Sequence, residues 1–195
     1  MNRLNRRVAA RELLKERGEL IVVAGLGSPA YDVAASGNEA LEFPTWGAMG
    51  GAVMIGLGLA LAQPTHNVLV LTGDGEMLMG LGSLATVALQ NPPNLRVVVM
   101  DNGLFGETGG QPTHVGVTDL AAVAHACGIN NTRTIYEMSD VPNLRSDIHA
   151  YDGTLFAVLK ISNEEVPRVL PPRDGAFLTH RFRHELLGAD AALDA

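Results

Sequence analysis

Apolar and polar positions alternate along the chain in two kinds of segment. Short runs rich in aliphatic and β-branched residues predict strands at residues 19–25, 40–43, 67–73, 94–102, 132–137 and 154–162. Longer segments, several with apolar residues at helical spacing, predict helices at residues 4–17, 31–36, 47–62, 80–91, 118–128 and 139–150. Strands and helices therefore alternate through most of the chain.

The aliphatic strands are continuous rather than alternating, as in RVVVM at residues 96–100. Such strands are buried on both faces, which is typical of a parallel sheet covered by helices. The predicted fold class is therefore α/β, with three layers in which a mostly parallel sheet is flanked by helices. A length of 195 residues fits a single domain, residues 1–195. Residues 163–195 form a tail rich in proline and arginine, whose helix at residues 172–188 should cap the surface outside the sheet.

Composition excludes several classes of function. Fourteen basic and 21 acidic side chains give a net charge of -7, which argues against nucleic acid as a partner. The longest uncharged stretch contains the apolar segment GAVMIGLGLALA, which is shorter than the about 20 residues that a membrane span needs. A single cysteine, Cys127, excludes an internal disulfide framework and a multi-thiolate metal site. The first residues lack the apolar core of a signal peptide, so we expect a cytoplasmic protein.

Two polar residues follow neighbouring predicted strands. Asp74 lies between Gly73 and Gly75 after one strand, and Asn102 follows the next. The carboxyl ends of parallel strands meet at one edge of a sheet, so the two side chains should lie close together. With a backbone carbonyl of the following loop they form an all-oxygen set suited to Mg²⁺ or Ca²⁺. Asp74 could instead only cap the next helix; the position of Asn102 favours the metal.

A magnesium ion at this edge predicts a phosphate ligand. Mg²⁺ usually completes its coordination sphere with water and phosphate oxygens. Gly73 and Gly75 would let a diphosphate approach the backbone closely, and the N–H groups of Gly75, Glu76 and Met77 would donate to it. The predicted partner of Asp74 is thus a cation that bridges to a diphosphate.

The stretch GDGEMLMGLGSLATVALQNPPNLRVVVMDN resembles the signature of thiamine diphosphate-dependent enzymes. The resemblance implies that Asp74, the Asn102 side chain and the main-chain oxygen of Leu104 hold Mg²⁺ on the diphosphate. The upstream TWGAMGGAVMIGLGLALA is similar to the family's segment beneath the thiazolium ring. There Gly47 would offer its carbonyl to the aminopyrimidine and Met49 would support the bent cofactor. The further cofactor-binding residues implied are Ala48, Phe105, Gly106, Glu107 and Thr108.

Within this family the chain most resembles sulfopyruvate and phosphonopyruvate decarboxylases, through DNGLFGETGGQPTH. Where those relatives commonly have serine, this chain has Glu107. The resemblance implies a β subunit of a 2-oxo acid decarboxylase that acts on a small anionic substrate. No segment resembles the pyrimidine-binding domain, whose glutamate activates the cofactor, so an α subunit should supply it, in an α2β2 or larger assembly. A carboligase and a non-catalytic regulatory subunit remain alternatives.

Two glycine-rich loops complete the candidate site. The segment GETGGQPTH is too rich in glycine for regular structure to be expected, and it is a candidate substrate loop. In this loop Gln111, Thr113 and His114 would bind the substrate or relay a proton. The segment GLGSPA at residues 25–30 matches a nicotinamide dinucleotide fingerprint, but Pro29 should interrupt the helix that this fingerprint needs. In a thiamine enzyme Ser28 of this loop would instead face the diphosphate.

Overall fold

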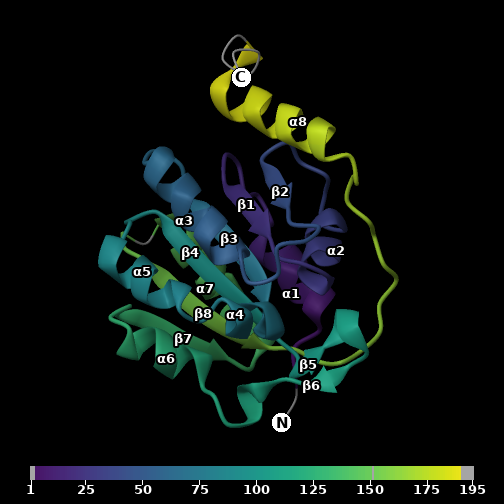
Figure 1. Cartoon of the computed structure of the whole chain (residues 1–195), viewed down its shortest axis with the longest axis vertical. Coiled ribbons are helices and arrows are strands. Elements are labelled where there is room, and N and C mark those ends of the chain that lie inside the picture. The colour runs from purple at the N-terminus through teal and green to yellow at the C-terminus, as the bar shows by residue number, and fades with distance from the viewer. Residues whose placement is uncertain (1–2, 151, 190–195) are drawn as a thin grey trace.

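A six-stranded parallel sheet forms the centre of the molecule (Figure 1). The computed structural model describes residues 3–150 and 152–189. The strand order is β2-β1-β3-β4-β8-β7. These strands are β1 (Ile21–Ala24), β2 (Glu42–Pro44), β3 (Val68–Gly73), β4 (Leu95–Asp101), β7 (Asn131–Ile135) and β8 (Leu155–Lys160). The predicted α/β class with a parallel sheet is confirmed.

The central strands of the sheet consist largely of aliphatic residues, which favours their burial between two layers of helices. Every residue of β4 is buried, as is every residue of β1, because both faces of these strands are covered by helices. The pairing of β3 with β4 sets Gly73 opposite Met100. The two strands therefore end together, and the residues that follow them begin at the same edge of the sheet.

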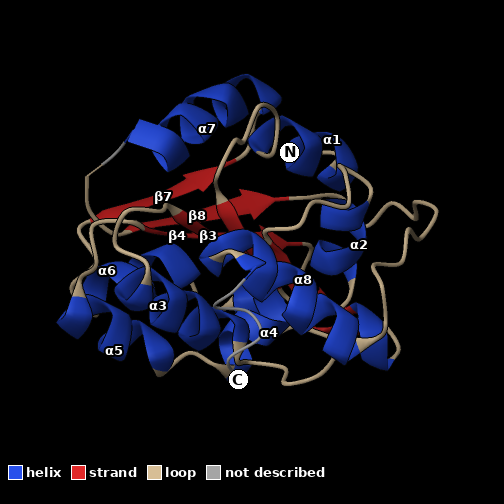
Figure 2. Ribbon diagram, turned by 90° about the horizontal axis from the view of Figure 1, so that it is seen from above, coloured by secondary structure: helices blue, strands red, loops and turns tan. Residues whose placement is uncertain are grey.

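Helices cover both faces of the sheet (Figure 2). Apolar residues of α1, α2 and α7 share one buried cluster with one face, and residues of α3, α4, α5 and α6 share a second cluster with the other. The helices are α1 (Arg6–Leu13), α2 (Ser28–Ala34), α3 (Ala52–Ala62), α4 (Asp74–Met79), α5 (Ser83–Gln90), α6 (Leu120–Ala126), α7 (Val141–Ala150) and α8 (Gly175–Leu187). None of them, within the described ranges, combines the length and the apolar character that crossing a bilayer requires.

Two local expectations are corrected. The helix predicted at residues 80–91 is preceded by a separate short helix, α4, and α5 starts only at Ser83. A Cβ atom at Gly80 would lie 2.3 Å from the carbonyl oxygen of Gly50, so the break between α4 and α5 lets two backbones meet. Likewise, Pro29 does not interrupt α2: it lies in the first turn, where its missing N–H has no intrahelical partner.

The segment after β4 is more regular than its glycine content predicted. Strands β5 (Leu104–Phe105) and β6 (Gln111–Pro112) pair in antiparallel fashion, which we call the β5–β6 hairpin. The remaining short turns are the 3₁₀ helices η1 (Gly106–Thr108), η2 (His114–Gly116) and η3 (Met138–Asp140). The expectation of an irregular loop here is therefore wrong.

The C-terminal helix packs against the sheet at its β2 edge. The Phe182 ring of α8 meets the Phe43 ring of β2 edge to face, with centroids 5.5 Å apart. The indole N–H of Trp46 donates to the carbonyl oxygen of Pro172 at 2.8 Å. Figure 1 shows α8 at the end of the molecule opposite the β5–β6 hairpin. The last part of the tail, residues 190–195, lies outside the described residues.

Candidate active site

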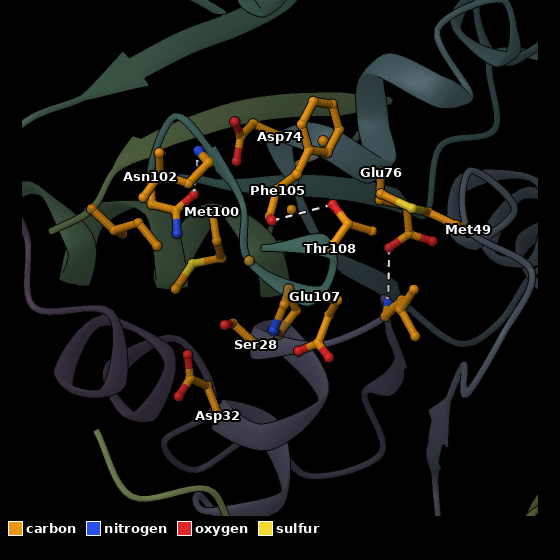
Figure 3. Close-up of a pocket in the computed structure, with 17 residues that line it drawn as sticks. Ser28, Asp32, Met49, Asp74, Glu76, Met100, Asn102, Phe105, Glu107 and Thr108 are labelled. Carbon is orange, nitrogen blue, oxygen red and sulfur yellow. Dashed lines mark hydrogen bonds between the residues drawn. The ribbon is translucent and has the colours of Figure 1, made fainter. Parts of the chain in front are cut away.

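A pocket opens at the carboxyl ends of the central strands, beside the β5–β6 hairpin (Figure 3). It encloses about 600 Å³, its open mouth included. The predicted cofactor-binding residues that line it are Met49, Gly73, Asp74, Gly75, Glu76, Asn102, Leu104, Phe105, Gly106, Glu107 and Thr108. Three others do not. Gly47 and Ala48 line a separate groove beside α8, and the Met77 side chain is buried in the core.

Asp74 and Asn102 lie together at the edge where β3 and β4 end. Figure 3 shows both on the same side of the pocket. The backbone N–H of Asn102 faces the Asp74 carboxylate and lowers its pKa. The Asn102 side-chain oxygen accepts from the N–H of Leu104 at 2.9 Å. Asp74, at the start of α4, therefore lies beside the turn after β4 that carries Asn102 and Leu104.

The electrostatics of Asp74 favour a cation. Its side chain is 2% exposed, and burial raises its pKa; the nearby Asp101 carboxylate raises the pKa further. The Thr113 hydroxyl, which donates to Oδ2 at 2.5 Å, acts in the opposite direction. No Lys, Arg or His among the described residues forms an ion pair with Asp74. A divalent cation would supply the missing positive charge.

The donor set also limits which metal fits. No three His, Cys, Asp or Glu side chains converge as a metal site in the described part of the chain. One carboxylate, one side-chain amide and main-chain carbonyls remain, and these hard oxygen ligands suit Mg²⁺ rather than zinc or copper. The residues present therefore fit the predicted magnesium ion.

Glycines form the floor of the pocket. Around Gly73 the nearest atom to an added Cβ would be 4.0 Å away, in Pro29. At Gly75 a Cβ would lie 2.6 Å from the Phe105 ring and 3.6 Å from the Met49 side chain. Gly73 thus leaves open space for a ligand, while Gly75 must remain glycine because Phe105 and Met49 pack onto its backbone. This arrangement fits a ligand that approaches the chain closely beside Asp74.

Glu76 has a role that the sequence did not suggest. Its side chain is 4% exposed, and Oε2 accepts from the Thr72 hydroxyl at 2.8 Å and from the Leu26 N–H at 3.0 Å. Burial raises the pKa of this carboxyl, and those two hydrogen bonds lower it. Only its backbone N–H was predicted to matter. The sequence feature that could have indicated this role is the charged residue at the start of EMLM, whose other three residues are apolar.

The structure separates the three predicted catalytic residues. Thr113 is buried and turned toward Asp74. Gln111 is exposed, and its amide donates to the Thr108 carbonyl oxygen at 2.8 Å while its oxygen accepts from the Thr108 hydroxyl at 3.0 Å. His114 is also exposed, with its ring edge-on to Phe105. Neither Gln111 nor His114 lines the pocket, whereas Thr113 reaches Asp74.

The loop at residues 25–30 forms the opposite wall. Ser28 lines the pocket, as expected for this loop. A Cβ at Gly27, where φ is +77°, would lie 2.9 Å from a carboxylate oxygen of Glu107. The same carboxylate accepts a hydrogen bond from Tyr31, whose pKa is raised first by burial and then by this negative charge. Glu107 therefore places a carboxylate on the pocket wall, at the position where we expected this chain to differ from the decarboxylases that it resembles.

Comparisons with known proteins agree with this geometry. Residues 27–156 match the family described as thiamine pyrophosphate enzyme, C-terminal TPP binding domain. The chain is 39% identical to the sulfopyruvate decarboxylase subunit beta of Methanothermobacter thermautotrophicus, over 87% of this chain and 88% of that one. It is 38% identical to the phosphonopyruvate decarboxylase of Streptomyces viridochromogenes, over 91% of this chain but only 45% of that one.

Solved structures agree on the fold. Benzoylformate decarboxylase from Polynucleobacter necessarius superposes with a TM-score of 0.67 at 19% identity, over 84% of this chain and 34% of that chain. At such low identity the likeness concerns the fold alone.

Proposed function

This chain belongs to the thiamine pyrophosphate enzymes through their C-terminal cofactor-binding domain, and we propose that it is the β subunit of a thiamine diphosphate- and Mg²⁺-dependent 2-oxo acid decarboxylase. One observation carries the proposal. Asp74 and Asn102 meet at the ends of adjacent strands, beside open glycine backbone and without a cationic partner for Asp74 in the described chain. Two relatives that the chain matches over 88% and 89% of their own length are named sulfopyruvate decarboxylase subunit beta.

In this proposal the chain's own residues hold the cofactor's diphosphate end. Asp74, the Asn102 side chain and the Leu104 carbonyl would bind Mg²⁺, and Thr113 would fix the orientation of the Asp74 carboxylate through its hydrogen bond. The backbone N–H groups of Gly75, Glu76 and Met77 would donate to the diphosphate. When bound, thiamine diphosphate supplies an electron sink for the loss of carbon dioxide from the substrate.

A partner α subunit is part of the proposal. The chain matches nearly the whole length of one relative named as a subunit beta, but less than half of a phosphonopyruvate decarboxylase. The unmatched part of that longer chain leaves room for a second domain, which a separate subunit would supply to this chain. We propose that the α subunit carries the pyrimidine-binding domain and its activating glutamate, in an α2β2 or larger assembly.

The proposed substrate is a small anionic 2-oxo acid such as sulfopyruvate or phosphonopyruvate, after the names of the relatives. Gln111, Thr113 and His114 of the β5–β6 hairpin segment are the proposed substrate-handling residues.

The test is reconstitution. The purified chain is supplied with thiamine diphosphate and Mg²⁺, alone and mixed with its candidate α subunit, and carbon dioxide release is measured with sulfopyruvate, phosphonopyruvate and pyruvate. Release is expected only from the mixture, and Asp74→Ala should abolish it. Release by the chain alone would overturn the two-subunit assignment. Cofactor binding without turnover in the mixture would favour a regulatory subunit, and carbon–carbon bond formation would favour a carboligase.

A further inference from the structure

Glu76 joins parts of the chain that lie far apart in sequence. Its oxygen Oε2 accepts hydrogen bonds from Leu26, in the loop after β1, and from Thr72, in β3. A Cβ at Gly25 would lie 2.1 Å from that oxygen, so the backbone there is glycine where the carboxylate approaches it. One buried carboxylate thus ties β3 and α4 to the opposite wall of the pocket.

The other side of Glu76 faces the segment 47–51, which we call the Met49 loop. Oxygen Oε1 is buried and has no hydrogen-bond partner in good geometry among the described residues. The N–H groups of Gly50 and Ala52 nevertheless face the carboxylate closely enough to lower its pKa. The Met49 loop and the start of α3 therefore bring N–H donors to a buried carboxylate, which needs such partners.

Helix α3 needs such an acceptor. Its first N–H groups have no partner within the helix, and its N-cap, Gly51, has no side chain that could accept from them. A carboxylate near a helix N-terminus is also stabilised by the helix dipole. Glu76 therefore serves α3 as an acceptor from another helix, in place of a local cap residue.

The Met49 loop itself requires support. Ala48 has a φ of +54°, a left-handed conformation that costs free energy for a residue with a Cβ atom. Gly50, at a φ of +90°, is packed against Gly80 so tightly that a Cβ at Gly80 would lie 2.3 Å from its carbonyl oxygen. A strained loop persists only where its surroundings fix it, and Glu76 and Gly80 are the contacts that do so here.

We propose that Glu76 is a positioning residue, whose carboxylate fixes the Met49 loop and the start of α3 so that Met49 packs over Gly75 at the pocket. This inference rests on the proposed function, because Met49 is assigned there to the ring portion of thiamine diphosphate. Glu76 acts through the loop and does not touch the diphosphate with its side chain. Removing the carboxylate should therefore weaken contacts with the rings and leave contacts with the diphosphate in place.

The first experiment examines the loop without any ligand. Amide hydrogen exchange is measured for residues 47–55 in the wild-type chain, in Glu76→Ala and in Thr154→Val. The control Thr154→Val removes another buried hydrogen bond, to the Pro92 carbonyl oxygen, away from the pocket. Exchange in the Met49 loop should rise about tenfold in Glu76→Ala and stay unchanged in the control. Unchanged exchange in Glu76→Ala overturns the proposal.

The second experiment compares two probes, thiamine diphosphate with Mg²⁺ and inorganic pyrophosphate with Mg²⁺. Glu76→Ala should bind thiamine diphosphate about tenfold more weakly and pyrophosphate within about twofold of the wild type. Glu76→Gln keeps one acceptor oxygen, so its affinity for thiamine diphosphate should lie between those of the wild type and Glu76→Ala. This variant also keeps the test valid if the alanine variant folds poorly. An equal loss for both probes overturns the positioning role. If the wild-type chain binds neither probe, the proposed function is refuted. The hydrogen-exchange experiment needs no ligand and would still test whether Glu76 fixes the Met49 loop.

Discussion

Two regions face the same pocket and are built in opposite ways. The β3–β4 edge, with Asp74 and Asn102, follows two central strands that are paired along their length and buried. The β5–β6 hairpin has two-residue strands, exposed Gln111 and two successive glycines with positive φ, Gly109 and Gly110. The edge is fixed by the sheet, whereas the exposed turn of the hairpin is closed by the side-chain contacts between Thr108 and Gln111. Cofactor binding should therefore depend on the edge and on the Leu104 carbonyl beside it, and be far less sensitive to changes at the exposed hairpin residue Gln111.

The largest expected effect follows from removing the carboxylate at the edge. Asp74→Ala should weaken Mg²⁺-dependent binding of thiamine diphosphate by more than about 100-fold, because it removes a metal ligand itself and not only a residue that orients one. Isothermal titration calorimetry at fixed Mg²⁺ measures this. Asp152→Ala, an exposed carboxylate that does not line the pocket, is the control. Unaltered affinity in Asp74→Ala would refute the metal site.

The edge was predictable from sequence for a physical reason. Strands buried on both faces leave continuous aliphatic runs, and residues that follow adjacent parallel strands must meet at one edge. Asp74 and Asn102 could thus be placed together without any structure. The hairpin could not be foreseen, because its strands are two residues long and form only through pairing of Leu104 with Pro112 and of Phe105 with Gln111.

Contacts between distant segments account for the other omissions. The partner of Glu76 in the loop after β1, Leu26, is separated from it by 50 positions. The break between α4 and α5 depends on the approach of Gly80 to Gly50, which no local pattern records. Thr113 was predicted to handle substrate, and its bond to Asp74 appears only once the hairpin folds back on the edge.

The pH dependence of stability should arise from a buried carboxylate of the sheet rather than from residues of the hairpin. Glu42 of β2 is 3% exposed, and burial raises its pKa from 4.5 to about 7, against the opposing effect of Arg17 at 2.7 Å. Because the folded pKa lies above the unfolded one, its contribution to stability is complete below about pH 4.5 and is lost as the pH rises through about 7. The free energy of unfolding should fall over that window by up to about 3 kcal/mol.

Urea denaturation at several pH values measures this slope. Glu42→Gln should flatten it, without removing the smaller contributions in the same direction from Asp74 and Glu76, whose pKa values burial also raises. Variants in the β5–β6 hairpin should leave the slope as it is. A slope that survives unchanged in Glu42→Gln would show that the charge of this carboxylate is compensated by Arg17 in the folded chain.

A smaller effect is expected where the two regions meet. Thr113→Val keeps the shape of the side chain but removes the hydrogen bond to Asp74 Oδ2. Cofactor affinity in the presence of Mg²⁺ should fall about tenfold, as for other residues that orient a metal ligand. Thr118→Val, a matched change in the following turn and outside the pocket, should have no effect. If Thr113→Val binds the cofactor normally, Asp74 is oriented by its backbone contacts alone.

The smallest effect on cofactor binding should come from the hairpin itself. Gln111→Ala removes both side-chain contacts with Thr108 that close the turn, but neither lies at the edge. An exposed hydrogen bond contributes only about 0.5–1.5 kcal/mol, so the hairpin should loosen locally while thiamine diphosphate affinity stays within about twofold of the wild type. Turnover with the α subunit should fall more than affinity, because the same turn positions the proposed substrate-handling residues. If affinity instead falls as far as in Thr113→Val, the hairpin and the edge act as one unit, and the separation between cofactor binding and substrate handling is wrong.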